Sequence, residues 1–259
     1  MRPLWTGTIG FGLVNIPVKL FSATQASELD LDMLDKKDNS NIRFIRVNEK
    51  TGKEVDYQNI VKGYKINDNY VILEDDDFES ANAVKTKVIE ITDFVMENEI
   101  DSIYYETPYY LAPEKSGVRA YALLREALQK TGKVGVATFV MRKKENLAII
   151  KVSGEALILS KMRFAEEIRD NKELTLPAKS AVKPAELKMA ISLINQLSGK
   201  FTIGKYKDQY TAQLLKMIKS KVKSGKSKPS SPLKIVHSKA KDLMDQLKQS
   251  LNTKQKKAS

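Results

Sequence analysis

The sequence predicts a mainly β fold with α-helices added after it. Between residues 4 and 151, most segments combine β-branched and aromatic residues and are separated by turn residues, which is typical of strands. Beyond about residue 184, the apolar residues recur at helical spacing instead. The chain has 259 residues, of which 42% are hydrophobic, so it can fill a large core. We expect four parts: a β domain over 1–183, a helical arm over 184–223, a flexible linker over 224–232, and a basic amphipathic helix and tail over 233–259.

The first half of the chain is predicted to contain a series of strands. Residues 9–21 mix β-branched and aromatic residues with Gly and Pro, which indicates a strand that bulges or lies at a sheet edge. Residues 43–47 alternate like a strand, and the Gly-containing turn 48–53 after them predicts a hairpin. The remaining strand candidates of this part are residues 70–73, 88–91 and 103–106.

A helix and a second hairpin follow. Residues 116–128 place apolar residues at helical spacing, and Gly132 is expected to end the helix. The β-rich segments 134–141 and 147–152 predict an antiparallel pair. The connection 142–146 begins with three cations, Arg142, Lys143 and Lys144.

The C-terminal part is predicted to be helical. Residues 184–197 form a helix with one apolar face, made of Ala190, Ile191, Ile194 and Leu197. Residues 205–223 continue as a lysine-rich helix, and the Ser, Gly and Pro of residues 224–232 indicate a tether.

The last predicted helix, residues 233–251, carries one apolar stripe. Its members are Val236, Ala240, Leu243, Met244, Leu247 and Leu251. A single amphipathic helix on a tether cannot bury such a stripe within itself, so we expect it to dock on a partner or to fold back on the chain.

The positive charge of the chain is concentrated at its C-terminal end. Residues 201–259 hold fifteen lysines against three aspartates, whereas residues 1–200 hold equal numbers of cationic and anionic side chains. A lysine-rich tail on a neutral body predicts contact with a polyanion such as nucleic acid. The alternative is a solubilising tail without a specific partner.

The composition excludes several kinds of catalytic site. The chain has no Cys and a single His, His237, so disulfides, thiolate metal sites and sites built on two histidines are excluded. Gly7, Gly10 and Gly12 occur in the wrong order for a dinucleotide-binding loop, and the sequence has no P-loop. We expect no cofactor, no metal and no enzymatic activity. The N-terminus lacks the apolar core of a signal peptide and no stretch is long enough to span a bilayer, so we expect a cytoplasmic, nucleoid-associated protein.

The densest carboxylate cluster of the sequence is Glu74, Asp75, Asp76 and Asp77. Such a cluster could hold Mg²⁺ for nuclease chemistry. Its position before an apolar segment favours a helix N-terminus instead, where acidic side chains accept from free amides.

Several sequence blocks follow one another in a fixed order along the chain. The most extended is residues 4–24, Leu-Trp-Thr-Gly-Thr-Ile-Gly-Phe-Gly-Leu-Val-Asn-Ile-Pro-Val-Lys-Leu-Phe-Ser-Ala-Thr. The others are residues 60–64, 99–104, 108–115, 120–128, 163–169 and 197–201. In sequence and order these blocks resemble the bacterial Ku family of non-homologous end joining, and residues 242–248 are similar to a terminal helix of many members.

The resemblance implies a Ku-core β-barrel with an arch, about residues 33–62, that passes over DNA. It also implies an arm of helices that embraces a second copy, which closes a ring-shaped homodimer. Such a protein binds double-stranded DNA ends of any sequence in the repair of DNA damage, at double-strand breaks, by a recombination pathway. It recruits and stimulates a multifunctional ATP-dependent end-joining DNA ligase and has no catalytic residues. Some relatives carry a Cys pattern in the arch, and the absence of Cys here excludes a metal-stapled arch.

The candidate DNA-binding residues are the cations of the arch, the hairpin turn and the tail. They are Lys36, Lys37, Arg43, Arg46, Lys50, Lys53, Arg142, Lys143, Lys144, Lys216, Lys219, Lys221, Lys223, Lys226 and Lys228. The candidate ligase-interaction residues are the apolar stripe Val236, Ala240, Leu243, Met244, Leu247 and Leu251. Each cation of the arch could equally be an ordinary surface residue of a hairpin. The alternative function is a general nucleoid or RNA-binding protein with a basic tail.

Overall fold

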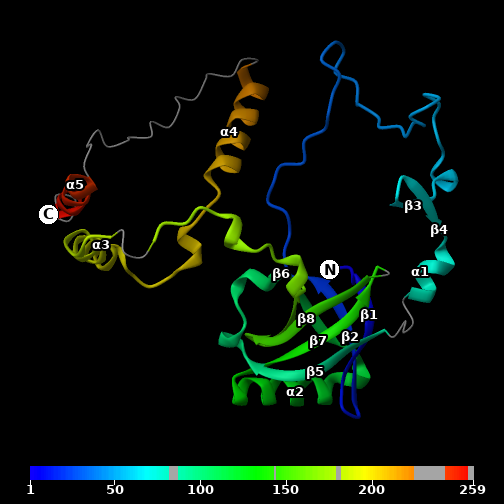
Figure 1. The fold of residues 1–259 in the computed structure, drawn as a ribbon, viewed down its shortest axis with the longest axis horizontal. Helices are drawn as coiled ribbons and strands as arrows, with labels where there is room; N and C mark the ends of the chain where they lie inside the picture. Colours follow the sequence, from blue (N-terminus) through cyan, green and yellow to red (C-terminus); the bar gives the residue numbers. More distant parts are fainter. Residues whose placement is uncertain (82–86, 143, 179–181, 225–242, 256–259) are drawn as a thin grey trace. The chain divides into compact units, whose positions relative to one another are not determined.

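The computed structural model describes the chain except for residues 82–86, 143, 179–181, 225–242 and 256–259 (Figure 1). The chain divides into two compact units. The first consists of Met1–Ala26 and Leu31–Asp170, and the second of Ser27–Asp30 and Asn171–Ser259.

A closed barrel of seven strands forms the centre of the first unit, with the strand order β1-β2-β6-β9-β8-β7-β5. All neighbours are antiparallel except β1 and β5, which pair in parallel. The strands are β1 (Trp5–Phe11), β2 (Val14–Ser22), β5 (Val88–Met96), β6 (Tyr105–Pro113), β7 (Lys133–Met141), β8 (Lys144–Ser153) and β9 (Ala156–Met162).

The barrel interior is filled by alternate side chains of its strands. Ile9, Ile16, Ile89, Leu157 and Leu159 are fully buried in one apolar cluster. This alternation is expected where one face of each strand points inward. The helix α2 (Val118–Thr131) packs against β2, β7 and β8 and crosses one end of the barrel (Figure 1).

Helix α2 is fixed to the barrel by its buried face. Tyr121, Leu124 and Leu128 point into the core at the spacing of successive helical turns. The hydroxyl of Tyr121 donates to the carbonyl of Leu111 and accepts from the backbone N–H of Leu157, both at 2.7 Å. One side chain therefore ties the helix to β6 and β9.

Several predicted elements are confirmed. The predicted helix 116–128 is α2, which ends before Gly132 with φ +67° as the prediction requires. The second hairpin is β7 and β8, although its turn is shorter than predicted because Met141 already pairs with Lys144. The prediction for residues 70–73 corresponds to β4.

Two strand predictions are wrong, and a third is wrong at its start. Residues 9–21 are not one strand, because Gly12 takes a φ of +56° and reverses the chain into the β1–β2 hairpin. Residues 43–47 do not form a strand, although the predicted turn 48–53 is present. The predicted strand 103–106 begins only at Tyr105, because residues 102–104 form a 3₁₀ turn.

The connection between β2 and β5 is long and carries little regular structure. It contains β3 (Lys62–Ile66) and β4 (Asn69–Leu73), which pair only with each other, followed by α1 (Asp75–Ala81). The 3₁₀ turns of the unit are η1 (Tyr57–Asn59), η2 (Glu97–Glu99), η3 (Ser102–Tyr104), η4 (Lys115–Gly117) and η5 (Ala165–Glu167).

The second unit is helical. It contains η6 (Asn171–Glu173), α3 (Pro184–Leu197), η8 (Ile203–Lys205), α4 (Gln209–Ser224) and α5 (Leu243–Gln255). Helix α5 contacts α3 (Figure 1). The predicted linker lies almost entirely outside the described residues, as do residues 233–242 of the predicted terminal helix. The domain bounds expected from the sequence therefore stay a prediction. In the part of the chain that the structure describes, no helix is long and apolar enough to cross a membrane.

Candidate nucleic-acid interface

The connection between β2 and β5 begins with a six-residue turn over residues 35–40. The backbone N–H of Asp35 donates to the carbonyl of Ser40, and that of Asn39 donates to the carbonyl of Asp35, both at 2.8 Å. The Asp35 carboxylate accepts from the N–H of Lys37 at 2.8 Å, and the Asp38 carboxylate from that of Ser40 at 2.9 Å. The bond from Ser40 lowers the pKa of Asp38 from its ordinary value.

Residues 48–53 form a second turn with the same hydrogen bonds. The N–H of Asn48 donates to the carbonyl of Lys53, and that of Gly52 donates to the carbonyl of Asn48, both at 2.8 Å. The Asn48 side-chain oxygen accepts from the N–H of Lys50 at 3.0 Å, and the Thr51 hydroxyl accepts from that of Lys53 at 3.4 Å. Gly52 has a φ of +65°, matching the φ of +61° at the equivalent Asn39.

The two turns are therefore copies of one backbone motif, and an isolated β-bridge flanks each of them. Each copy needs a side-chain acceptor at its first and fourth positions and a residue that tolerates positive φ at its fifth. In the sequence these positions read Asp-x-x-Asp-Asn and Asn-x-x-Thr-Gly. We did not predict this repeat, although its spacing is visible in the sequence.

The two turns and the segment between them carry exposed cations. The candidate cations of this connection are all exposed: Lys36, Lys37, Arg43, Arg46, Lys50 and Lys53. The guanidinium of Arg46 lies 5.3 Å from the ring centre of Tyr57, a cation–π distance that orients it.

The turn between β7 and β8 is the second cationic feature of the first unit. Arg142 is exposed and has a φ of +55°, in the left-handed region that an arginine rarely adopts. Lys144 forms an ion pair with Glu167 at 3.7 Å and is itself exposed. Lys143 lies outside the described residues.

A local excess of positive charge surrounds Glu167. Its carboxylate accepts from the N–H of Phe164 at 2.8 Å, and this bond, followed by the charges of Lys144, Lys161 and Arg163, lowers its pKa. Lys161 also pairs with Glu106 at 3.1 Å. We did not predict Lys161 and Arg163, because β9 and the following turn bring them beside Lys144 only in the folded barrel.

Helix α4 supplies the described tail lysines. Lys216, Lys219 and Lys223 lie at i, i+3 and i+7 on one exposed face, whereas Lys221 projects from the other side. Lys226 and Lys228 lie outside the described residues.

The predicted ligase-interaction stripe is described only in part. Leu243 is exposed, and Met244 and Leu247, half-buried, lie on one face of α5. Val236, Ala240 and the side chain of Leu251 lie outside the described residues.

The acidic cluster lies at a helix N-terminus, as the second interpretation of the sequence predicts. Asp75, Asp76 and Asp77 occupy the first turn of α1, and the Asp77 carboxylate accepts from the N–H of Glu74 at 2.8 Å. Within the described ranges, no three His, Asp or Glu side chains gather as metal ligands would. The candidate interface thus presents exposed amines and guanidiniums, which suit phosphate oxygens, and contacts to phosphate carry no base sequence information.

The comparisons with known proteins agree on one family. Residues 10–189 match the Ku70/Ku80 beta-barrel domain family. A protein of Opitutus terrae named "Non-homologous end joining protein Ku" is 41% identical over 255 residues, which cover 97% of this chain and 92% of that protein. Proteins with the same name from Cupriavidus necator and Coxiella burnetii are 42% and 38% identical. Those matches cover 89% and 98% of this chain, and 70% and 96% of the two proteins.

Proposed function

The chain belongs to the Ku family, and from this membership we propose that it binds double-stranded DNA ends, without sequence preference, in non-homologous end joining. The observation that carries the proposal is the match over residues 10–189 together with relatives that bear that name. The protein acts as a binding scaffold and not as an enzyme.

Exposed cations support binding that ignores sequence. The two turns over residues 35–40 and 48–53, the Arg142 turn and α4 all present positive charge on the surface. Contacts to phosphate give affinity and position but carry no base information, which suits a protein that must act at any break. Because residues 1–200 are neutral overall, the barrel unit holds DNA through these local groups, and the tail adds the net attraction.

We propose that end specificity comes from topology. The long connection between β2 and β5, about residues 33–62 of it, forms an arch, and two copies of the chain close a ring. A closed ring admits a free end but not continuous DNA. A gel-shift comparison of blunt linear duplex with relaxed circular duplex, at two salt concentrations, tests this. Equal affinity for both would favour the alternative, a general nucleoid or RNA-binding protein.

The exposed face of α3 supports the homodimer. Leu187, Ile191 and Ile194 lie at i, i+4 and i+7, and Leu197 ends the row; they are 48–62% exposed. A row of large apolar side chains on one helix face gains stability when a partner covers it. We propose that a second copy does so. Ile191→Glu should convert the dimer to monomers in sedimentation, and a dimer that persists would contradict this role for α3.

We propose that the tail recruits the end-joining ligase through α5 and the residues before it. The contact between α5 and α3 leaves Leu243 exposed, so a partner can reach part of the stripe. Truncation after Lys223 should preserve dimers and weaken stimulation of the ligase. Full stimulation by the truncated chain would contradict the assignment.

A further inference from the structure

The barrel has an incomplete seam between β1 and β5. β1 pairs with β5 only from Val88 to Glu90, whereas β7 follows β5 as far as Met96. Over the rest of β5, from Thr92 onward, one edge of the strand has no strand partner among the described residues. An unpaired strand edge can accept a further strand from another chain.

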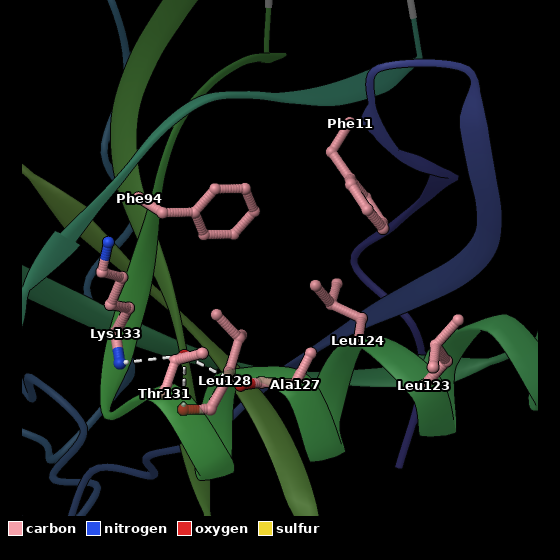
Figure 2. Close-up of a pocket in the computed structure, with 8 residues that line it drawn as sticks. All are labelled: Phe11, Phe94, Leu123, Leu124, Ala127, Leu128, Thr131 and Lys133. Carbon is pink, nitrogen blue, oxygen red and sulfur yellow. Dashed lines mark hydrogen bonds between the residues drawn. The ribbon is translucent and has the colours of Figure 1, made fainter.

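An apolar cavity lies where the seam opens. It has a volume of about 520 Å³ and lies between Phe11, Phe94 and the apolar side chains of α2 (Figure 2). The rings of Phe11 and Phe94 meet edge to face, with centroids 6.3 Å apart. Figure 2 shows both rings on one side of the cavity, with Leu124 and Leu128 of α2 on the opposite side.

The cavity is open and preformed. Phe94 is 40% exposed and Leu123 is 66% exposed, while Leu124 and Leu128 are buried and form the floor. Gly135 leaves room for the Phe94 ring, because a Cβ there would approach the ring to 3.3 Å. A concave apolar site beside an unpaired strand edge is typical of a surface that binds an extended peptide.

The charge at the cavity indicates what kind of segment it accepts. Lys133 lines the cavity, and Lys130 lies in the last turn of α2. Neither lysine has an ion pair among the residues that the structure describes, and no Asp or Glu lines the cavity. The chain's own tail is a poor occupant, because residues 201–259 hold fifteen lysines and no glutamate. Like charges would oppose its binding.

We propose that this surface docks an extended segment of a partner protein that combines apolar and acidic residues. The segment adds as a strand to the free edge of β5. Its side chains on one face, two residues apart, enter the cavity, because alternate residues of a strand share a face. An acidic side chain pairs with Lys133. This site shares no residue with the cationic turns, the α3 row or the tail, so it goes beyond the function proposed above.

The test is a selection of random peptides, displayed on phage, against the full-length chain. Enriched peptides are expected to hold apolar residues at alternate positions and at least one Asp or Glu. A fluorescein-labelled synthetic copy of the most enriched peptide then reports affinity by polarisation. Leu123→Asp should weaken binding about tenfold or more, since a charge placed among the apolar contacts of the site loses its water when a peptide covers it.

The matched control is Val118→Asp, because Val118 is an exposed apolar residue of the same helix that does not line the cavity. It should leave affinity unchanged. Selection against Lys133→Glu should enrich basic peptides in place of acidic ones. The proposal is overturned if no peptide is enriched, or if the natural chain enriches basic sequences such as that of its tail. It is also overturned if the two Asp variants weaken binding equally.

Discussion

The buried hydroxyl of Tyr121 gives the most direct test of how α2 is fixed to the barrel. Tyr121→Phe removes a group that donates to the Leu111 carbonyl and accepts from the Leu157 N–H, both at 2.7 Å. Each buried backbone group left without a partner costs about 1–3 kcal/mol, so with two such groups the variant should lose roughly 2–6 kcal/mol of unfolding free energy. That is a large share of the total stability of a typical domain.

Urea unfolding followed by tryptophan fluorescence measures this loss in the barrel unit. The chain has a single tryptophan, Trp5 in β1, which packs against the core and donates to the Val140 carbonyl at 3.1 Å. The matched control is Tyr110→Phe, because Tyr110 is partly exposed and its hydroxyl has no hydrogen bond in the described structure. It should change stability by less than about 0.5 kcal/mol. If both variants unfold at the same urea concentration, the hydroxyl does not hold the helix as argued.

Four further predictions concern single features of the first unit. Gly117→Ala should destabilise the barrel by about 1–3 kcal/mol, since its Cβ would lie 2.8 Å from the Pro17 carbonyl oxygen; unchanged urea unfolding would contradict this. Replacing the four lysines of the two turns by Gln should make DNA binding less sensitive to salt. The slope of log K against log salt concentration should fall by roughly 0.9 for each phosphate that the variant no longer neutralises. An unchanged slope would place the phosphate-binding groups elsewhere. Glu167→Gln keeps the bond from Phe164 but removes a negative charge beside three cations, so DNA should bind about twofold more tightly at low salt, while weaker binding would refute the role of this cluster. Burial raises the pKa of Tyr121 and Tyr105 above the ordinary value of 10.0. The stabilisation from their neutral forms is therefore complete below pH 10.0, and it is lost as the pH rises through the pKa values of the folded chain. Unfolding measured from pH 9 upward should therefore show a shallower decline for Tyr121→Phe than for the natural chain.

The sequence predicted those elements whose signals are local. Helix α2 has apolar residues at helical spacing and ends before Gly132. Gly132 has a positive φ, which glycine adopts readily, so this residue marks the helix end in the sequence itself. The pair β7 and β8 combines two β-rich segments with a short connection. In both cases local preference and tertiary packing agree, so the pattern alone was sufficient.

The wrong predictions concern segments whose conformation depends on distant partners. Residues 43–47 alternate like a strand, but they lie between two turns and no strand pairs with them. Residues 9–21 form an almost continuous apolar segment, and only the single residue Gly12 marks the reversal between β1 and β2. Strand pairing is a tertiary property, so periodicity could not distinguish one bulged strand from a hairpin.

The sequence predicted most of the cations of the candidate interface, but not which of them lie together in space. Exposed cations on the connection and on the turn before β8 follow from charge counts. The grouping of Lys144, Lys161 and Arg163 about Glu167 requires the pairing of β8 with β9, which no spacing in the sequence reveals.

The measurement that tests the central claim most directly is topological trapping. The protein is first bound to linear duplex, the DNA is then circularised by an added ligase, and the salt concentration is raised. If the protein threads onto ends as a closed ring, the complex on circular DNA survives the salt and is lost as soon as a restriction enzyme cuts the circle. If the complex leaves the circle as quickly as it leaves linear DNA, the protein does not encircle its ligand.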